Sequence, residues 1–122
     1  MTAVFLYGTL QPGERAWRMV EPYAVGEPRR ATVAGRLFDT GCFPALLLDD
    51  SARAPGTVVD VRDEDALMDL LDRYEREGSM YKRLPMIASD GTTCWTYVWI
   101  GDMRCLLAEL PDGWPAAVSA AA

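Results

Sequence analysis

The sequence predicts one α+β domain: a small mixed β-barrel or roll of about five to seven strands, with one main helix and one short helix. Segments rich in β-branched and aromatic residues recur along the chain, separated by turns that contain glycine or proline. One longer segment has the apolar spacing of a surface helix. Half of the 122 residues are hydrophobic, which suffices for a core without a disulfide or a metal.

The first expected strand covers residues 4–7, and a short helix follows at 14–20. Further strands are expected at 31–38, 45–48, 56–61, 81–88 and 93–100, with a polar loop between the second and third of these. Pro85 predicts an edge position or a bulge, and Asp90-Gly91 predicts a hairpin turn. Residues 1–115 are expected to form the domain, and the alanine-rich tail at 116–122 is expected to be disordered.

The chain has no histidine, which limits its chemistry. A Ser-His-Asp site, a Cys-His site and a histidine-ligated zinc are excluded within the chain, so proton transfer falls to carboxylates, tyrosines, lysine or water. The net charge of −6 argues against nucleic acid as the main partner, because neutralising phosphates requires a basic surface.

Three cysteines, Cys42, Cys94 and Cys105, are an odd number without CxxC spacing, which favours reduced thiols and a cytoplasmic protein. No apolar run approaches the roughly 20 residues that span a bilayer, so no membrane association is expected. The first residues have no basic stretch and run directly into a predicted strand, which is not typical of a signal peptide.

The main helix is expected over residues 63–75, with Asp63 as its N-cap and acidic residues in its first turn. One face of this helix is apolar and carries Leu67, Leu70, Leu71 and Tyr74. The opposite face is charged, and two i,i+4 ion pairs are expected there, Asp69 with Arg73 and Asp72 with Arg76.

Glu75 breaks this pattern, because on the helical wheel it falls between Leu71 and Met68, inside the apolar face. Burial without a nearby cation raises the pKa of a carboxyl group, which makes the carboxylate a better general base at neutral pH. The alternative is that the helix frays near residue 75, so that Glu75 turns to water or pairs with Lys82 or Arg83.

A second candidate is the segment Tyr7-Gly8-Thr9-Leu10, which leads from the first strand into a loop. Successive backbone N–H groups at such a place can hold a carboxylate or an oxyanion, and Gly8 permits close approach of the backbone. The alternative is a simple turn whose tyrosine and leucine belong to the core. Arg29, Arg30 and Arg36 are interpreted as surface charges, although they could attract a substrate carboxylate.

The Tyr7-Gly8-Thr9-Leu10 segment, followed by Gly13, is the first of an ordered series of motifs. The others are Gly35-Arg36-Leu37-Phe38-Asp39, Gly41-Cys42-Phe43-Pro44-Ala45-Leu46, Gly56-Thr57-Val58-Val59-Asp60-Val61, Leu71-Asp72-Arg73-Tyr74-Glu75 with Tyr81-Lys82-Arg83, and Asp112-Gly113-Trp114. Over residues 4–114 this series resembles the γ-glutamylcyclotransferase (AIG2-like) family.

The resemblance implies an enzyme that cyclises a small γ-glutamyl amide or amine to 5-oxoproline. The backbone of Tyr7, Gly8, Thr9 and Leu10 would bind the glutamyl half, and Glu75 would act as the general base on its α-ammonium group. Tyr81 would contribute a hydroxyl group or be a packed core tyrosine. Because the substrate supplies the nucleophile, no cofactor and no metal are required. The competing hypothesis is a non-catalytic module that retains the γ-glutamyl pocket for a small ligand.

The chain departs from the family pattern at two points. Arg76 directly follows Glu75, where members often have glycine, and the loop after Gly13 reads Glu14-Arg15-Ala16-Trp17 without the asparagine that many members carry. The leaving amine stays open among glutathione, γ-glutamyl amino acids, γ-glutamyl-ε-lysine and a protected biosynthetic intermediate, because all share the same glutamyl half. The oligomeric state also stays open.

Overall fold

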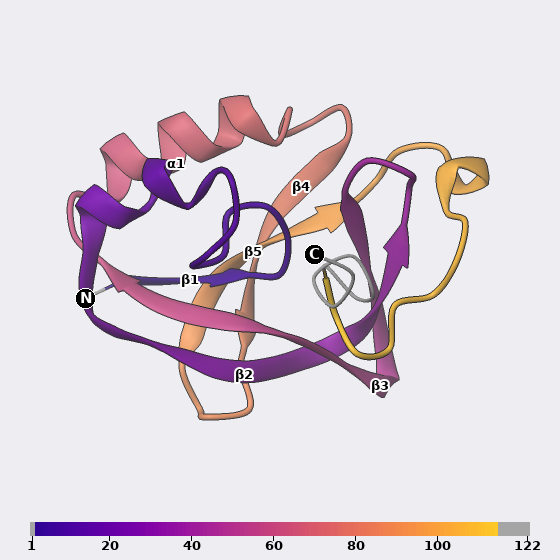
Figure 1. Cartoon of the computed structure of the whole chain (residues 1–122), viewed down its shortest axis with the longest axis horizontal. Coiled ribbons are helices and arrows are strands. Elements are labelled where there is room, and N and C mark those ends of the chain that lie inside the picture. Colours follow the sequence, from indigo (N-terminus) through magenta and orange to yellow (C-terminus); the bar gives the residue numbers. More distant parts are fainter. Residues whose placement is uncertain (1, 115–122) are drawn as a thin grey trace.

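The structure is a computed structural model that describes residues 2–114, so the predicted disordered tail at 116–122 lies outside the described residues. Five strands form one mixed sheet, in the order β2-β3-β1-β5-β4, and one α-helix packs on it (Figure 1). The elements are β1 (Thr2–Leu6), β2 (Ala24–Asp39), β3 (Pro44–Val61), α1 (Glu64–Tyr74), β4 (Tyr81–Ile87) and β5 (Thr93–Trp99). The predicted α+β class and the main helix are confirmed.

Strand β1 lies in the middle of the sheet, antiparallel to β3 and parallel to β5. Because successive side chains point to opposite faces, β1 supplies both sides of the core. Val4 and Leu6 pack with Leu67 and Leu71 of α1, whereas Phe5 and Tyr7 face the other side with apolar residues of the long strands β2 and β3. The chain leaves β1 between these two layers, beside the end of α1 (Figure 1).

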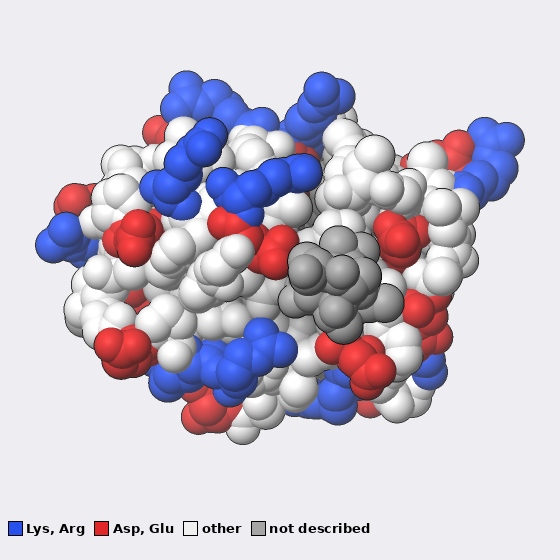
Figure 2. All heavy atoms as spheres, viewed as in Figure 1, with Lys and Arg blue, Asp and Glu red and all other residues white. Residues whose placement is uncertain are grey.

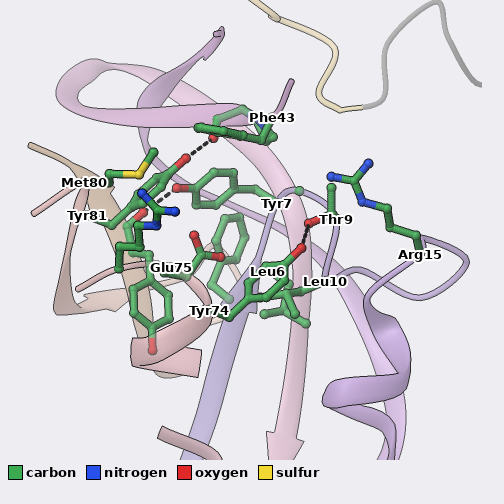
Figure 3. Close-up of a pocket in the computed structure, with 15 residues that line it drawn as sticks. Leu6, Tyr7, Thr9, Leu10, Arg15, Phe43, Tyr74, Glu75, Met80 and Tyr81 are labelled. Carbon is green, nitrogen blue, oxygen red and sulfur yellow. Dashed lines mark hydrogen bonds between the residues drawn. The ribbon is translucent and has the colours of Figure 1, made fainter. Parts of the chain in front are cut away.

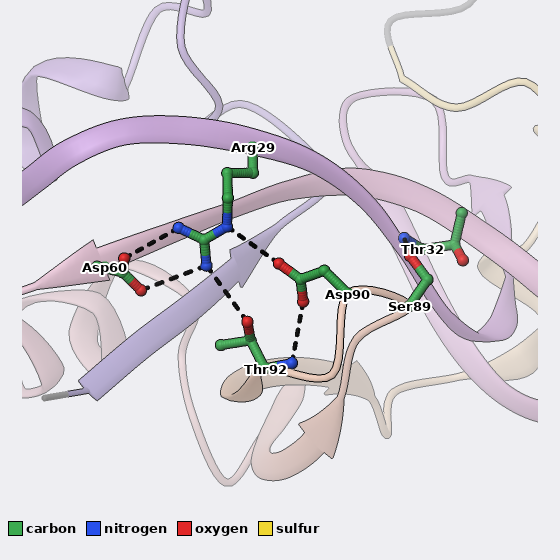
Figure 4. A network of polar contacts seen from close by, with 6 residues as sticks. All are labelled: Arg29, Thr32, Asp60, Ser89, Asp90 and Thr92. Carbon is green, nitrogen blue, oxygen red and sulfur yellow. Dashed lines mark hydrogen bonds and ion pairs between the residues drawn. The ribbon is translucent and has the colours of Figure 1, made fainter.

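The sheet is open, because its edge strands β2 and β4 are not paired with each other. It curls until the turn between β4 and β5 touches β2, where the Ser89 backbone N–H donates to the Thr32 carbonyl at 2.8 Å. Arg29 of β2 adds ion pairs to Asp90 of that turn at 3.0 Å and to Asp60 of β3 at 2.9 Å (Figure 4). Of the two predicted shapes, the fold is therefore a roll and not a closed barrel.

The predicted loop between residues 48 and 56 is wrong, because β3 is one strand from Pro44 to Val61. Pairing with β2 extends along this strand, and the shift in register between Ala34 and Gly35 accommodates residues 49–52 as a bulge. The predicted short helix at 14–20 is replaced by 3-10 turns at Trp17–Met19 and Glu21–Tyr23. Long-range pairing and local turns override the propensity signals at these places.

The predicted start of α1 is confirmed and Asp63 occupies its N-cap position, but the side chain of Asp63 does not cap the helix. Asp63 has a left-handed backbone, with a φ of 51°, and its side chain makes no capping hydrogen bond. Glu64 instead ties the start of the helix to the sheet, accepting from the Thr2 hydroxyl at 2.6 Å and from the Trp95 indole N–H at 2.9 Å. These two bonds fix the register of α1 over β1 and β5.

Pro85 lies on the edge strand β4, and the Asp90-Gly91 turn joins β4 to β5, both as predicted. Gly91 has a φ of 87°, the left-handed region that the turn requires. On the face seen in Figure 2, basic and acidic side chains are interspersed. Within residues 2–114, no helix is both long and apolar enough to cross a membrane.

Candidate active site

A cavity of about 310 Å³ opens where β1 ends and α1 ends. It is lined by Phe5, Leu6, Tyr7, Gly8, Thr9, Leu10, Arg15, Phe43, Pro44, Tyr74, Glu75, Arg76, Met80, Tyr81 and Tyr97 (Figure 3). Glu75, Tyr81 and the segment 7–10, which were predicted to carry catalysis and substrate binding, are all on this wall. Segments far apart in the sequence meet here, because the end of β1 lies beside the end of the helix that crosses it.

Glu75 stays on the inward side of the helix because the helical hydrogen bonds continue to it: its N–H donates to the Leu71 carbonyl at 2.8 Å. Its carboxylate points into the cavity (Figure 3). The alternative in which the helix frays and Glu75 turns to bulk water is therefore not what the structure shows. Lys82 and Arg83 are not its partners either, since no ion pair or hydrogen bond joins them to it within residues 2–114.

Directly after Glu75 the chain turns away through a Schellman motif. The Arg76 N–H donates to the Arg73 carbonyl at 3.3 Å, and the Glu77 N–H donates to the Asp72 carbonyl at 2.9 Å. Arg76 occupies the left-handed position of this motif, with a φ of 51°, where glycine is the usual residue. A side chain in this conformation costs roughly 1–2 kcal/mol. A glycine at this position would be free of this strain.

The end of α1 is held by Asp72, which bonds to two strands at once. Its carboxylate accepts from the Arg83 guanidinium at 3.0 and 3.2 Å and from the Tyr97 hydroxyl at 2.6 Å. The Arg83 guanidinium also stacks 4.6 Å over the Trp95 ring. The predicted pair of Asp72 with Arg76 is therefore wrong, because the turn takes Arg76 out of the helix while β4 places Arg83 beside Asp72. Asp69 and Arg73 form no ion pair in the described part of the chain.

The Glu75 carboxylate has no hydrogen-bond donor and no cation as a partner among the described residues. It is half-buried, since its open side faces the cavity and protein atoms surround the rest. Desolvation raises the pKa of Glu75 to about 7. Burial also raises the pKa of Tyr7 and Tyr81, and the charge of Glu75 adds to both increases. The carboxylate is therefore a base whose protonation changes near neutral pH.

Two of the tyrosines that line the cavity, Tyr7 and Tyr81, use their hydroxyl protons elsewhere. The Tyr7 hydroxyl donates to the Tyr97 backbone carbonyl, and the Tyr81 hydroxyl donates to the Pro44 carbonyl at 2.7 Å. Tyr81 is 3% exposed and packs edge-on against Trp99, with ring centroids 5.3 Å apart. Of the two predicted roles for Tyr81, this arrangement corresponds to the packed tyrosine, which here also shapes the cavity.

The segment after β1 lines the cavity and carries backbone donors without an acceptor among the described residues. The N–H groups of Gly8, Thr9 and Leu10 have no acceptor among residues 2–114, whereas the carbonyls of Gly8 and Thr9 accept from Gln11 and Ala16. Gly8 lies against Pro44: a Cβ at residue 8 would stand 2.8 Å from the Pro44 Cγ. The loop therefore passes closer to the wall than any larger residue allows, and leaves three N–H groups for a ligand.

Several lining residues were not predicted to belong to the site. Phe43 and Pro44 belong to a family-like motif without a predicted role, and Arg15 is only a departure from the family pattern. Arg76 is such a departure too, and was otherwise expected only as a surface partner of Asp72. Met80 gave no signal in the sequence. The three arginines considered as carboxylate ligands are not on this wall: Arg29 and Arg36 pair with carboxylates, and Arg30 donates to Gln11 and Thr57.

Solved structures share this fold. A mouse AIG2-like protein is 22% identical, with a TM-score of 0.69 over 82% of this chain and 78% of that chain. An uncharacterised protein from Pyrococcus horikoshii is 15% identical, with a TM-score of 0.69 over 92% and 87% of the two chains. A uropathogenic E. coli-specific protein is 13% identical, with a TM-score of 0.68 over 91% and 88%.

The family is shown by the sequence itself. The model of the γ-glutamyl cyclotransferase, AIG2-like family matches residues 4–115, and the chain belongs to this family. The resemblance drawn from the ordered motifs is thereby confirmed. The sequence matches no curated protein at a significant level.

Proposed function

We propose that this protein is a γ-glutamylcyclotransferase-type enzyme, which converts a γ-glutamyl amide or amine to 5-oxoproline and the free amine. The observation that carries the proposal is the position of Glu75: a carboxylate without a partner among the described residues, with a pKa of about 7, shares one cavity with three free backbone N–H groups. Family membership supports the same reaction class.

The reaction needs one base and one set of donors. Glu75 takes a proton from the substrate's α-ammonium group, and the freed amine nitrogen attacks the carbon of the γ-carbonyl. The new C–N bond closes the five-membered ring, and the negative charge that develops on the carbonyl oxygen requires hydrogen-bond donors. The bond to the departing nitrogen then breaks as Glu75 returns its proton to that nitrogen. The ring nitrogen gives up its second proton through Glu75 to the released amine, so the products are 5-oxoproline, whose amide nitrogen is neutral, and an ammonium group, and the enzyme ends as it began.

The protein's part in this scheme is to hold the substrate folded. Attack within one molecule is fast when its two reacting atoms are held in contact, so the enzyme needs no nucleophile of its own. The N–H groups of Gly8, Thr9 and Leu10 bind the glutamyl half, including its carboxylate or the oxyanion. The aromatic walls made by Tyr7, Tyr81 and Phe43 exclude water from the reacting atoms.

The presence of Glu75 favours an enzyme over a non-catalytic binding module. A module that only binds the anionic glutamyl group gains little from a second carboxylate held away from cations, whereas proton transfer requires a base. We also propose that the enzyme works in the cytoplasm, on the basis of its three free cysteines, of which Cys94 is buried. Imaging of the tagged chain tests this location.

The test of the activity is 5-oxoproline release from a panel of γ-glutamyl amino acids, amides and amines. We expect turnover by the wild-type protein and a loss of at least about a hundredfold in Glu75→Gln, which keeps the shape but removes the base. Glu77→Gln is the matched control, since it removes a carboxylate two residues away that does not line the cavity. No turnover on any member of the panel, or equal turnover by wild type and Glu75→Gln, would contradict the proposal.

A further inference from the structure

The cavity carries two arginines that the proposed reaction does not use. Arg15 comes from the segment after β1, and Arg76 directly follows Glu75 at the end of α1. Neither guanidinium has a hydrogen-bond acceptor or an ion-pair partner among residues 2–114, whereas those of Arg29 and Arg83 are both paired with carboxylates. Within the described chain, the wall therefore holds two uncompensated positive charges and a single carboxylate.

Arg76 is also held in a conformation that a side chain rarely adopts. Its φ of 51° is the left-handed value of a Schellman motif, a position where glycine is free of strain. Strained positions that keep a non-glycine residue are concentrated at functional sites. Within the described residues, the other non-glycine residue with a positive φ is Asp63, at the far end of α1 and outside the cavity lining.

The two arginines lie on different walls, which separates their roles. Arg15 extends on the side of Thr9 and Leu10, across the cavity from Tyr81 (Figure 3). That side presents the free N–H groups proposed to hold the glutamyl half. Glu75 must reach both the α-amine and the departing nitrogen, so the departing group lies beside the end of α1, which carries Arg76.

We propose that Arg76 is a specificity-determining residue that binds a carboxylate on the departing amine. This inference rests on the proposed function and deepens it. Such a substrate carries three charges: its α-carboxylate is matched by the N–H groups of the loop and Arg15, its α-ammonium by Glu75, and its second carboxylate by Arg76. A guanidinium suits this role because its parallel N–H groups match the two oxygens of a carboxylate. The substrate class is therefore γ-glutamyl derivatives of amino acids or peptides whose leaving group is anionic.

The test uses three substrates that differ mainly in the charge of the leaving group. These are γ-glutamylglycine, which releases an anionic group; γ-glutamylglycinamide, which is neutral; and the mono-γ-glutamyl amide of ethylenediamine, which is cationic. We expect the wild-type protein to prefer γ-glutamylglycine, and this preference to shrink as ionic strength rises. Release of 5-oxoproline from each gives kcat and KM.

Arg76→Gly and Arg76→Gln are the informative variants. We expect both to lower kcat/KM for γ-glutamylglycine roughly tenfold, mainly through KM. For γ-glutamylglycinamide, kcat/KM should stay within about twofold of the wild-type value. Arg76→Gly also relieves the backbone strain, so its Tm rises by about 3–6 °C. Asp63→Gly is the matched control, since it relieves the same strain outside the cavity and leaves the order of substrates unchanged. Arg15→Gln is expected to lower kcat/KM for all three substrates to a similar extent.

The outcomes separate the two proposals. Equal losses on all three substrates in Arg76→Gly, or a wild-type preference for the neutral or cationic substrate, overturn the role of Arg76 while 5-oxoproline formation stands. A selective loss in Arg15→Gln instead of Arg76→Gly also overturns it. Absence of turnover on all three substrates by the wild-type protein overturns the proposed function, and this inference with it.

Discussion

The hydroxyl groups of Thr9 and Tyr74 are hydrogen-bonded to each other at 2.8 Å, and this bond joins the two halves of the candidate site. Thr9 belongs to the loop that presents free N–H groups, and Tyr74 is the last residue of α1, next to Glu75. The two hydroxyls are separated by 65 positions in the sequence, so the bond exists only in the folded chain. This bond sets the distance between the proposed base, Glu75, and the backbone N–H groups of the loop.

Removing this bond should reduce activity through geometry. We expect Thr9→Val and Tyr74→Phe each to lower kcat/KM several-fold, and the double variant to be no worse than the single ones, because both remove the same interaction. The coupling between them should be about 1 kcal/mol. Steady-state kinetics on the four proteins measures this coupling, and fully additive losses would show that the bond does not position the site.

The activity should fall in acid as Glu75 gains a proton. Its pKa of about 7 places the acid limb of the kcat/KM profile near neutral pH, whereas a carboxylate at its ordinary value would stay active to well below pH 6. We expect kcat/KM to drop about tenfold for each pH unit below the limb. A profile measured from pH 5 to 9 on one substrate tests this, and a flat profile down to pH 5 contradicts it.

The same group should make the protein less stable at neutral pH than in mild acid. Because the folded pKa of Glu75 lies above its unfolded value, the folded state binds the proton more tightly, and stability decreases as pH rises from about 4.5 to about 7. Glu75→Gln removes the free-energy cost of ionising this buried carboxyl group. We expect it to raise the free energy of unfolding by on the order of 1–3 kcal/mol at pH 8 and by much less at pH 4.5.

Urea denaturation of the wild type and Glu75→Gln at the two pH values measures this difference. Glu77→Gln, which changes an exposed carboxylate, is expected to show no comparable dependence on pH. If Glu75→Gln were equally stabilising at both pH values, its effect would come from packing and not from ionisation.

Asp72 should matter for activity although it does not line the cavity. Asp72→Asn keeps the volume but weakens the bonds to Arg83 and Tyr97, so the end of α1 is held less firmly. We expect a loss of about 1–2 kcal/mol in stability and a several-fold lower kcat. Asp69→Asn, an exposed change on the same helix, is the control and should alter neither. Thermal melts of both variants measure the change in stability, and steady-state kinetics measures the change in kcat.

Gly8 should be intolerant of the smallest side chain. In Gly8→Ala the new Cβ meets the Pro44 Cγ at 2.8 Å and the Pro44 Cδ at 3.1 Å, so the loop must move away from the wall. We expect kcat/KM to fall at least about tenfold, since misplaced donors no longer face the reacting carbonyl. Pro44→Ala removes both clashing atoms, and the double variant should recover much of the activity. Absence of recovery would mean that the loss has another cause.

Local signals in the sequence were enough to predict several features of the structure. The apolar spacing of the main helix places Glu75 on the inward face, because the helical period depends on neighbouring residues alone. The Asp90-Gly91 turn and the edge position of Pro85 likewise follow from backbone preferences of single residues. These predictions are confirmed because tertiary contacts act in the same direction as the local ones.

Other features depend on contacts that no local pattern contains. The continuity of β3 follows from its pairing with β2, which overrides the turn residues between 48 and 56. The partner of Asp72 is Arg83 and not Arg76, because the Schellman turn redirects the chain before β4 returns it. Phe43 and Pro44 join the cavity wall through the curl of the sheet.

The sequence by itself determined the family, the helix and the carboxylate on its inward face, because these rest on the order of motifs and on local periodicity. The tertiary structure decided what surrounds that carboxylate: a wall without a cation paired to it among the described residues, three free N–H groups and two unpaired arginines. The physical reason is that solvation and charge at Glu75 are set by residues brought together from distant segments, whereas its direction is set by its own helix.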